Sequence, residues 1–159
     1  MSKNDIYRKR VRDVMVKHVV AVNPQDSVSD ALRTMIENHV SALPVVDGHE
    51  RCVGVISATD LLHLAQQLGG ELEALHQAEG LSRELLEEQL ERTGFSNQFV
   101  QEVMTHSAVT VQPDATLVAA AGDMIRNKVH RLAVTDAKGV LQGIISTMDI
   151  IRALAESGE

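Results

Sequence analysis

Apolar and polar residues follow one another in a pattern that predicts a β-α-β-β-α unit in the first part of the chain. Apolar residues recur at i, i+3, i+4, i+7 and i+8 after Ser27 and predict an amphipathic helix facing a core: Val28, Ala31, Leu32, Met35 and Ile36. Ser27 and Asp30 have the spacing of an N-cap and its capping-box partner. Apolar runs at 19–22, 43–46 and 52–56 predict strands, and a second helix begins at Asp60.

The same pattern returns 89 residues later, which indicates an internal duplication. The stretch Gly54-Val55-Ile56-Ser57-Ala58-Thr59-Asp60 recurs as Gly143-Ile144-Ile145-Ser146-Thr147-Met148-Asp149. The matches continue outside it, where Met15, Pro24 and Asn38 correspond to Met104, Pro113 and Asn127. Because each unit leaves one sheet face uncovered, we expect an α+β fold in which the two units bury these faces about a pseudo-twofold axis.

The repeats and the residues around them divide the chain into four parts. We predict a polar leader at 1–10, a first repeat at 11–68, an acidic helical insert at 69–99 and a second repeat at 100–156. Gly69 and Gly70 break the preceding helix, and the stretch from Gly70 to Arg92 carries seven glutamates against two arginines. The insert is either a linker packed on its own module or a surface for a dimer or partner.

Composition restricts the class of protein. Of 159 residues, 44% are apolar and 2% aromatic, so the core must be aliphatic, and stacking-based binding of single-stranded nucleic acid is not expected. The formal net charge of −7 argues against nucleic acid or an anionic membrane as partner. No apolar run reaches the roughly 20 residues of a membrane span, and the single cysteine, Cys52, fits a reducing compartment. We therefore expect a soluble cytoplasmic protein.

The repeated closing stretch carries the chemistry. Each copy runs from an apolar strand through a serine, Ser57 or Ser146, to an aspartate at a helix start, Asp60 or Asp149. Free N–H groups at a helix start attract anions, and a serine hydroxyl can add a hydrogen bond to a phosphate oxygen. A carboxylate would repel phosphate but can accept both hydroxyls of a ribose. The sequence therefore suggests a nucleotide site that is present twice.

These residues resemble the CBS-domain family, named after cystathionine β-synthase. The resemblance rests on Val14-Met15, Val103-Met104-Thr105, the two proline turns, Leu43-Pro44-Val45-Val46-Asp47 and the two Gly-x-x-Ser-x-x-Asp closers. It implies a regulatory module with paired repeats that binds AMP, ADP, ATP or a related adenosyl ligand in two clefts, and that pairs into a disc-shaped homodimer. Carried over to this chain, Asp60 and Asp149 hold ribose, Ser57 and Ser146 face phosphate, and Thr59 offers an extra hydroxyl.

The second repeat also contains His130-Arg131-Leu132-Ala133-Val134, which is similar to a run in the nucleotide-sensing γ subunits of AMP-activated kinases. The similarity implies that His130 and Arg131 contact phosphate, and an arginine fork suits that role. Because the first repeat has Ser41-Ala42 instead, we expect one competent site that pairs His130 and Arg131 with Asp60, and a weaker site at Asp149. The alternative is that both side chains lie at a polar strand edge.

The sequence also bears on two other functions, an enzyme and a structural dimerisation module. An enzyme is disfavoured because none of the seven histidines forms an i, i+4 pair or a metal-binding cluster with cysteine, and we expect neither a metal nor a catalytic cofactor. A structural dimerisation module with empty clefts is the main alternative to a nucleotide sensor. Any signal must pass to a separate effector protein, which the sequence does not identify. The residues also do not rank AMP, ATP, S-adenosylmethionine and NAD as ligands.

Overall fold

The computed structural model describes residues 5–67, 94–106 and 108–158, which fall into two compact units. Among the described residues, the first unit comprises 20–48, 53–67 and 94–106, and the second comprises 5–19, 49–52 and 108–158. Each unit combines helices with a three-stranded sheet, so the predicted α+β fold with two repeated units is confirmed. The predicted insert lies mostly at 68–93, outside the described residues.

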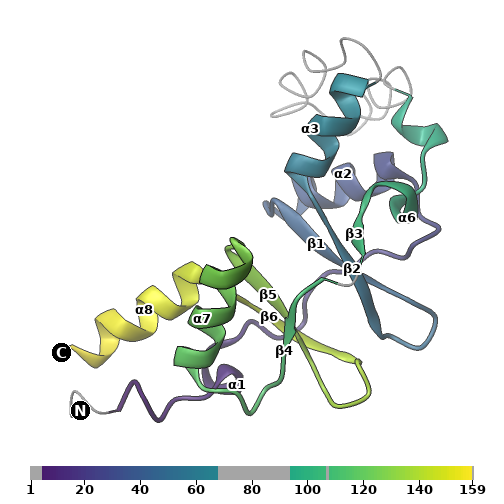
Figure 1. Cartoon of the computed structure of the whole chain (residues 1–159). Helices are drawn as coiled ribbons and strands as arrows, with labels where there is room; N and C mark the ends of the chain where they lie inside the picture. Colours follow the sequence, from purple (N-terminus) through teal and green to yellow (C-terminus); the bar gives the residue numbers. More distant parts are fainter. Residues whose placement is uncertain (1–4, 68–93, 107, 159) are drawn as a thin grey trace. The chain divides into compact units, whose positions relative to one another are not determined.

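The first unit is built around the sheet β1-β2-β3 (Figure 1). Its elements in chain order are α2 (Val28–Glu37), β1 (Ala42–Val46), β2 (Cys52–Ser57), α3 (Ala58–Gln67), the 3-10 helix η1 (Phe95–Asn97), α6 (Val100–Val103) and β3 (Thr105–His106). Helix α2 contacts α3, α6, β1 and η1. The buried side chains between these elements form one core, with Leu43, Ile56, Leu61 and Phe95 at most 1% exposed.

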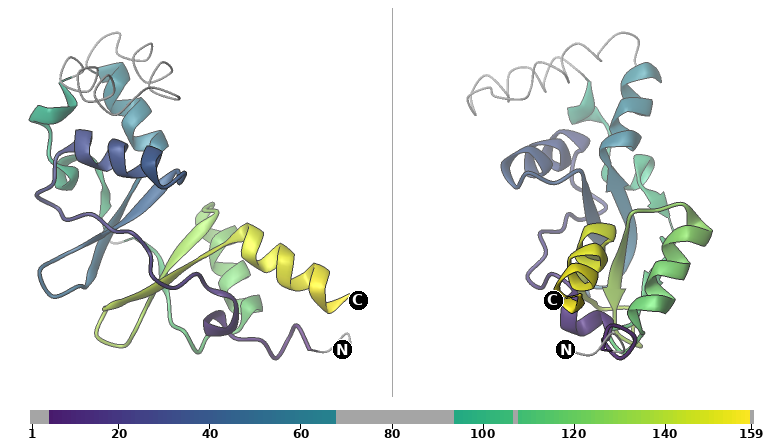
Figure 2. Two further views of the ribbon diagram at one scale, coloured as in Figure 1. Left: turned by 180° about the vertical axis from the view of Figure 1, so that it is seen from behind. Right: turned by 90° about the vertical axis from the view of Figure 1, so that its left-hand side faces the viewer.

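The second unit repeats this plan around the sheet β4-β5-β6, in which β4 is parallel and β6 antiparallel to β5. Figure 2 shows its last helix in yellow, leading to the C-terminus. Its elements are α1 (Val11–Val14), β4 (Thr110–Val111), α7 (Leu117–Asn127), β5 (Arg131–Thr135), β6 (Leu141–Ser146) and α8 (Thr147–Ser157). Helices α7 and α8 pack on each other and on β5 and β6 respectively. The core includes Val11 from α1 together with Leu132, Val134 and Ile145 from the sheet.

Each unit contains the body of one repeat and the opening segment of the other. The opening helix of the first repeat, α1, belongs to the second unit, where Val16 forms an antiparallel bridge with Ile144 of β6. The opening segment of the second repeat, α6 and β3, belongs to the first unit, where β3 pairs with Gly54 and Val55 of β2. The linear order of the repeats does not predict this exchange.

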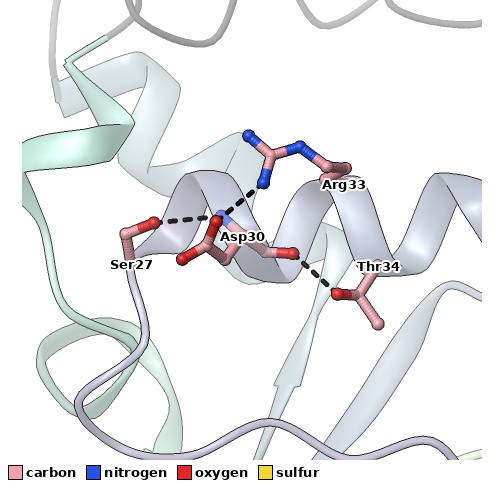
Figure 3. Close-up of polar contacts among 4 residues, drawn as sticks. All are labelled: Ser27, Asp30, Arg33 and Thr34. Atoms are coloured by element: carbon pink, nitrogen blue, oxygen red, sulfur yellow. Dashed lines mark hydrogen bonds and ion pairs between the residues drawn. The ribbon is translucent and has the colours of Figure 1, made fainter. Parts of the chain in front are cut away.

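The start of α2 follows the sequence closely, with one difference. Ser27 caps the helix, and its Oγ accepts a hydrogen bond from the Asp30 N–H at 3.1 Å (Figure 3). The Asp30 carboxylate, expected to complete a capping box, instead accepts a hydrogen bond from Arg33 at 2.8 Å. Thr34 donates to the Asp30 carbonyl at 2.8 Å. The predicted amphipathic face is confirmed, because Val28, Ala31, Leu32 and Met35 are buried.

One predicted strand is reduced to a single bridge. Of residues 19–22, only Val22 pairs, in a parallel bridge with Val45. The chain turns immediately afterwards, where the Asn23 N–H donates to the Asp26 carboxylate at 2.8 Å instead of to a neighbouring strand. Strand pairing therefore cannot extend past Val22. The predicted strands at 43–46 and 52–56 are confirmed as β1 and β2, within one residue at each end.

Candidate functional site

Helix α8 begins with a reciprocal capping box between Ser146 and Asp149. The Asp149 N–H donates to Ser146 Oγ at 3.3 Å. In return, Asp149 Oδ2 accepts from the Ser146 N–H at 2.8 Å and from the Ser146 hydroxyl at 2.9 Å. Both side chains are therefore fixed by the helix start itself.

Helix α3 begins in the same way, with Ser57 and Asp60 in the corresponding places. Asp60 Oδ2 accepts from the Ser57 N–H at 2.8 Å and from the Ser57 hydroxyl at 3.0 Å, and the Asp60 N–H donates to Ser57 Oγ at 3.3 Å. The two helix starts thus agree in every bond and to within 0.1 Å in distance. Duplication has preserved the geometry of the junction as well as its sequence.

This geometry limits what the serines and aspartates can offer to a ligand. Each serine hydroxyl proton is directed to its own aspartate, so binding a phosphate oxygen requires the hydroxyl to change partner. One carboxylate oxygen, Oδ2, already accepts two hydrogen bonds in each unit. The other oxygen, Oδ1, therefore provides most of the remaining capacity for a sugar hydroxyl.

The surroundings of the two aspartates differ. Asp149 is only 7% exposed, and its Oδ1 lies 3.6 Å from an Arg152 guanidinium nitrogen. Asp60 is half-buried, and the residue at the same place on its helix is His63, which is exposed. Thr59 is exposed beside Asp60, whereas Met148 occupies that position beside Asp149. The Asp60 carboxylate is thus the more accessible of the two.

His130 and Arg131 lie at the start of β5, beside the end of β6. The His130 carbonyl accepts from the Thr147 N–H at 2.8 Å and from the Thr147 hydroxyl at 3.1 Å. Arg131 is paired with Ser146 in the β5–β6 register, so their side chains lie on the same face of the sheet. The structure therefore brings Arg131 to the Asp149 junction within one unit. The predicted pairing of His130 and Arg131 with Asp60 involves both units and stays a prediction.

The first unit has the same backbone contact without the basic side chains. The Ser41 carbonyl accepts from the Ala58 N–H at 2.8 Å, as the His130 carbonyl does from Thr147. Ser41 is exposed and Ala42 is buried at the start of β1. The difference between the two junctions that the sequence indicates is therefore present at equivalent places in the fold.

A pocket of about 160 Å³ opens beside Asp149 within the second unit. It is lined by Lys9, Asp13, Val14, Asp149, Arg152, Ala153 and Glu156. Sequence reasoning missed the four charged residues around Asp149. Arg152 and Glu156 follow it at i+3 and i+7, a spacing on one helix face that could have revealed them. Asp13 lies in the exchanged helix α1 and Lys9 lies just before it, and no local pattern in the sequence places either residue beside Asp149.

The structure was also searched for metal-binding clusters and for membrane-spanning helices. Within residues 5–67, 94–106 and 108–158, no group of three or more His, Cys, Asp or Glu side chains is placed to hold a metal ion. None of the helices in that part of the chain has the length and hydrophobicity that spanning a bilayer requires.

Both repeats of the chain match a known protein family. Residues 11–66 and 100–156 both match the family model described as CBS domain. The protein MJ1426 of Methanocaldococcus jannaschii is 30% identical over 154 residues, which cover 91% of this chain and 90% of that protein. Inosine-5'-monophosphate dehydrogenase of the same organism is 28% identical over 144 residues, but the match spans only 23% of the enzyme.

A solved structure has the same fold. The crystal structure of CBSX2 in complex with AMP superposes with a TM-score of 0.72 and 30% identity, covering 94% of this chain and 98% of that one. The full CBSX2 protein of Arabidopsis thaliana is longer, and the matched part is 57% of its length. The likeness therefore concerns the repeated module.

Proposed function

Because the chain belongs to the CBS domain family, we propose that it is a regulatory module that binds an adenosyl ligand such as AMP, ADP or ATP and signals to a separate effector protein. The main support is the pair of serine–aspartate helix starts, which have the same hydrogen bonds in both units. The likeness to CBSX2, which was crystallised with AMP, supports the choice of ligand class.

The proposed contacts follow the geometry of each unit. Asp60 and Asp149 accept ribose hydroxyls through their Oδ1 oxygens. Ser57 and Ser146 donate to phosphate after leaving their aspartates, and Thr59 adds a hydroxyl beside Asp60. His130 and Arg131 supply cationic donors to phosphate, because an arginine fork donates two charge-assisted hydrogen bonds to one phosphate. The proposed ligand is regulatory, and we propose no catalytic step. We also propose that the protein is cytoplasmic.

Ligand binding should raise thermal stability. At a ligand concentration a hundredfold above Kd, binding adds about 2.7 kcal/mol to the free energy of unfolding. We expect AMP, ADP or ATP at millimolar concentration to raise the melting temperature of the purified chain, and titration calorimetry to rank them. Inorganic pyrophosphate and tripolyphosphate, which carry phosphate but no ribose, serve as controls for general polyanion effects. A chain whose melting temperature stays constant with every adenosyl compound would instead be a ligand-free dimerisation module.

We also propose that the chain forms a homodimer through helices α7 and α8. These helices expose five large apolar side chains: Val118, Ile125, Met148, Ile151 and Leu154. Ile125 is the most exposed, at 78%. Exposed apolar side chains that gather on one helix pair are unfavourable in water, and a protein interface would bury them.

A charge on this face should separate the proposed dimer. We expect Ile125→Glu to shift the molar mass measured by light scattering from that of two chains to that of one, because an interface would bury the carboxylate. Val20→Glu is the matched control, since Val20 is also an exposed apolar residue but lies outside both helices. A wild-type chain that is monomeric at about 100 µM would contradict the proposal.

A further inference from the structure

Residues 5–9, which we name the N-terminal latch, have a structural counterpart in residues 94–98 of the first unit. The 89-residue offset matches Asp5 with Gly94 and Lys9 with Gln98. In both segments the fourth N–H donates to the first carbonyl at 3.1 Å. The fifth N–H donates to the second carbonyl, at 3.3 Å in the latch and 3.2 Å in its counterpart. The same turn therefore precedes the opening helix of each repeat.

The latch is held less firmly than its counterpart. Phe95 is 0% exposed in the core of the first unit, whereas Ile6 at the matching position is only partly buried against the core of the second. The Gln98 carbonyl accepts from the first N–H of α2 at 2.9 Å, and the Lys9 carbonyl accepts from the first N–H of α7 at 3.3 Å. Because its anchor buries less apolar surface and its bond is longer, the latch detaches at a lower cost in free energy.

The latch forms one wall of the pocket beside Asp149. Lys9 lines this pocket of about 160 Å³ together with residues of α1 and α8. In both views of Figure 2 the N-terminal segment, in purple, lies near the C-terminal end of α8. Asp149 is 7% exposed, whereas Asp60 is half-buried and the counterpart of Lys9 in its unit is the shorter Gln98. A sugar hydroxyl therefore reaches Asp149 freely only when a wall of the pocket moves.

The other two walls are more firmly fixed than the latch. Helix α8 is held by its own capping box and by its contacts with α7 and β6. Helix α1 is held by Val11, which is 0% exposed and whose N–H donates to the Ala115 carbonyl at 2.9 Å. Lys9 depends instead on the partly buried Ile6 and on its longer bond to α7. The latch is therefore the wall that moves at the lowest cost.

We propose that the latch keeps the Asp149 junction closed to nucleotide, and that its release opens a second binding site in the chain. In the closed state Lys9 lies beside Asp149, and AMP binds at Asp60 alone. When residues 5–9 detach, α1 and α8 keep their places and Asp149 Oδ1 becomes accessible to a ribose. This inference rests on the proposed function, because it assumes that both carboxylates hold ribose.

Hydrogen exchange in the wild-type chain tests how firmly the latch is held. The N–H groups of Leu117 and Val28 are matched, because each is the first of its helix and donates to the last carbonyl of its segment. Measured by NMR and corrected for intrinsic rates, the Leu117 N–H should exchange about tenfold faster or more, because exchange requires its segment to detach. Equal rates at the two positions would overturn the inference.

Ile6→Ser should release the latch, because it removes the apolar anchor. We expect trypsin to cleave after Arg8 or Lys9 about tenfold faster than in the wild-type chain, since cleavage follows the population of the detached form. In titration calorimetry the number of AMP molecules bound per chain should double. Tyr7→Ser is the matched control, because Tyr7 is the next residue and is 65% exposed, and it should change neither measurement.

Thermal unfolding without ligand checks that Ile6→Ser remains folded, and if it does not, the exchange rates of the wild-type chain decide. Faster cleavage with an unchanged number of bound AMP molecules overturns the inference while the proposed function stands. A wild-type chain that already fills both sites has the same meaning. If AMP binds neither to the wild-type chain nor to Ile6→Ser, the proposed function and the inference both fall.

Discussion

Gly143→Ala is expected to lower the free energy of unfolding by about 1–3 kcal/mol, the usual cost of forcing an extra group into a packed site. A Cβ at this position would lie 2.5 Å from the Val16 carbonyl oxygen and 3.1 Å from Met15 Sδ. Val16 cannot withdraw freely, because its N–H and carbonyl both bond to Ile144 at 2.9 and 3.0 Å. The substitution therefore strains the junction between α1's segment and β6.

Chemical denaturation followed by circular dichroism measures this change. Gly54→Ala should lower the free energy of unfolding by a similar amount, since its Cβ would lie 2.6 Å from the Thr105 carbonyl oxygen and 3.0 Å from Met104 Sδ. Gly48→Ala is the control, because nothing lies within 4 Å of its Cβ, and it should change the free energy of unfolding by less than about 0.5 kcal/mol. Equal stability of Gly143→Ala and Gly48→Ala would contradict the close approach of Val16 to β6.

The sequence predicts the elements of each repeat but not the exchange of opening segments between the two units. Periodicity located α2, β1, β2 and α3, because burial of one face repeats at the spacing of the element itself. It could not show that Val16 pairs with Ile144, since strand partners distant in sequence leave no local pattern. The repeated glycines Gly54 and Gly143 were the available signal, because each marks a close backbone approach.

The candidate site was also predicted only in part from the sequence. Repetition identified Ser57, Asp60, Ser146 and Asp149, and the structure shows why the spacing recurs: each pair caps its helix. The sequence did not reveal that Oδ2 is already occupied, because a capping box and a ligand site require the same residue types at the same spacing. The charged neighbours from α1's segment were likewise hidden, because only the folded chain places them beside Asp149.

Asp60→Asn is expected to weaken AMP binding by about ten- to hundredfold, because a hydrogen bond to a charged acceptor contributes about 1.5–3 kcal/mol. Asparagine keeps a side-chain oxygen for the helix cap, so the fold should persist. Asp149→Asn should change AMP affinity by less than about threefold, since Asp149 is 7% exposed and its Oδ1 already faces Arg152. The more accessible Asp60 should therefore carry most of the AMP binding.

Titration calorimetry with AMP on both variants measures this difference, and thermal unfolding without ligand checks that each remains folded. The two substitutions are matched, because the serine–aspartate bonds agree within 0.1 Å in the two units. A larger loss from Asp149→Asn than from Asp60→Asn would reverse the assignment and show that Asp149, although only 7% exposed, carries most of the AMP binding. Unchanged affinity in both variants would show that neither carboxylate holds the sugar, because a lost charged acceptor cannot leave the binding free energy of its ligand unaltered.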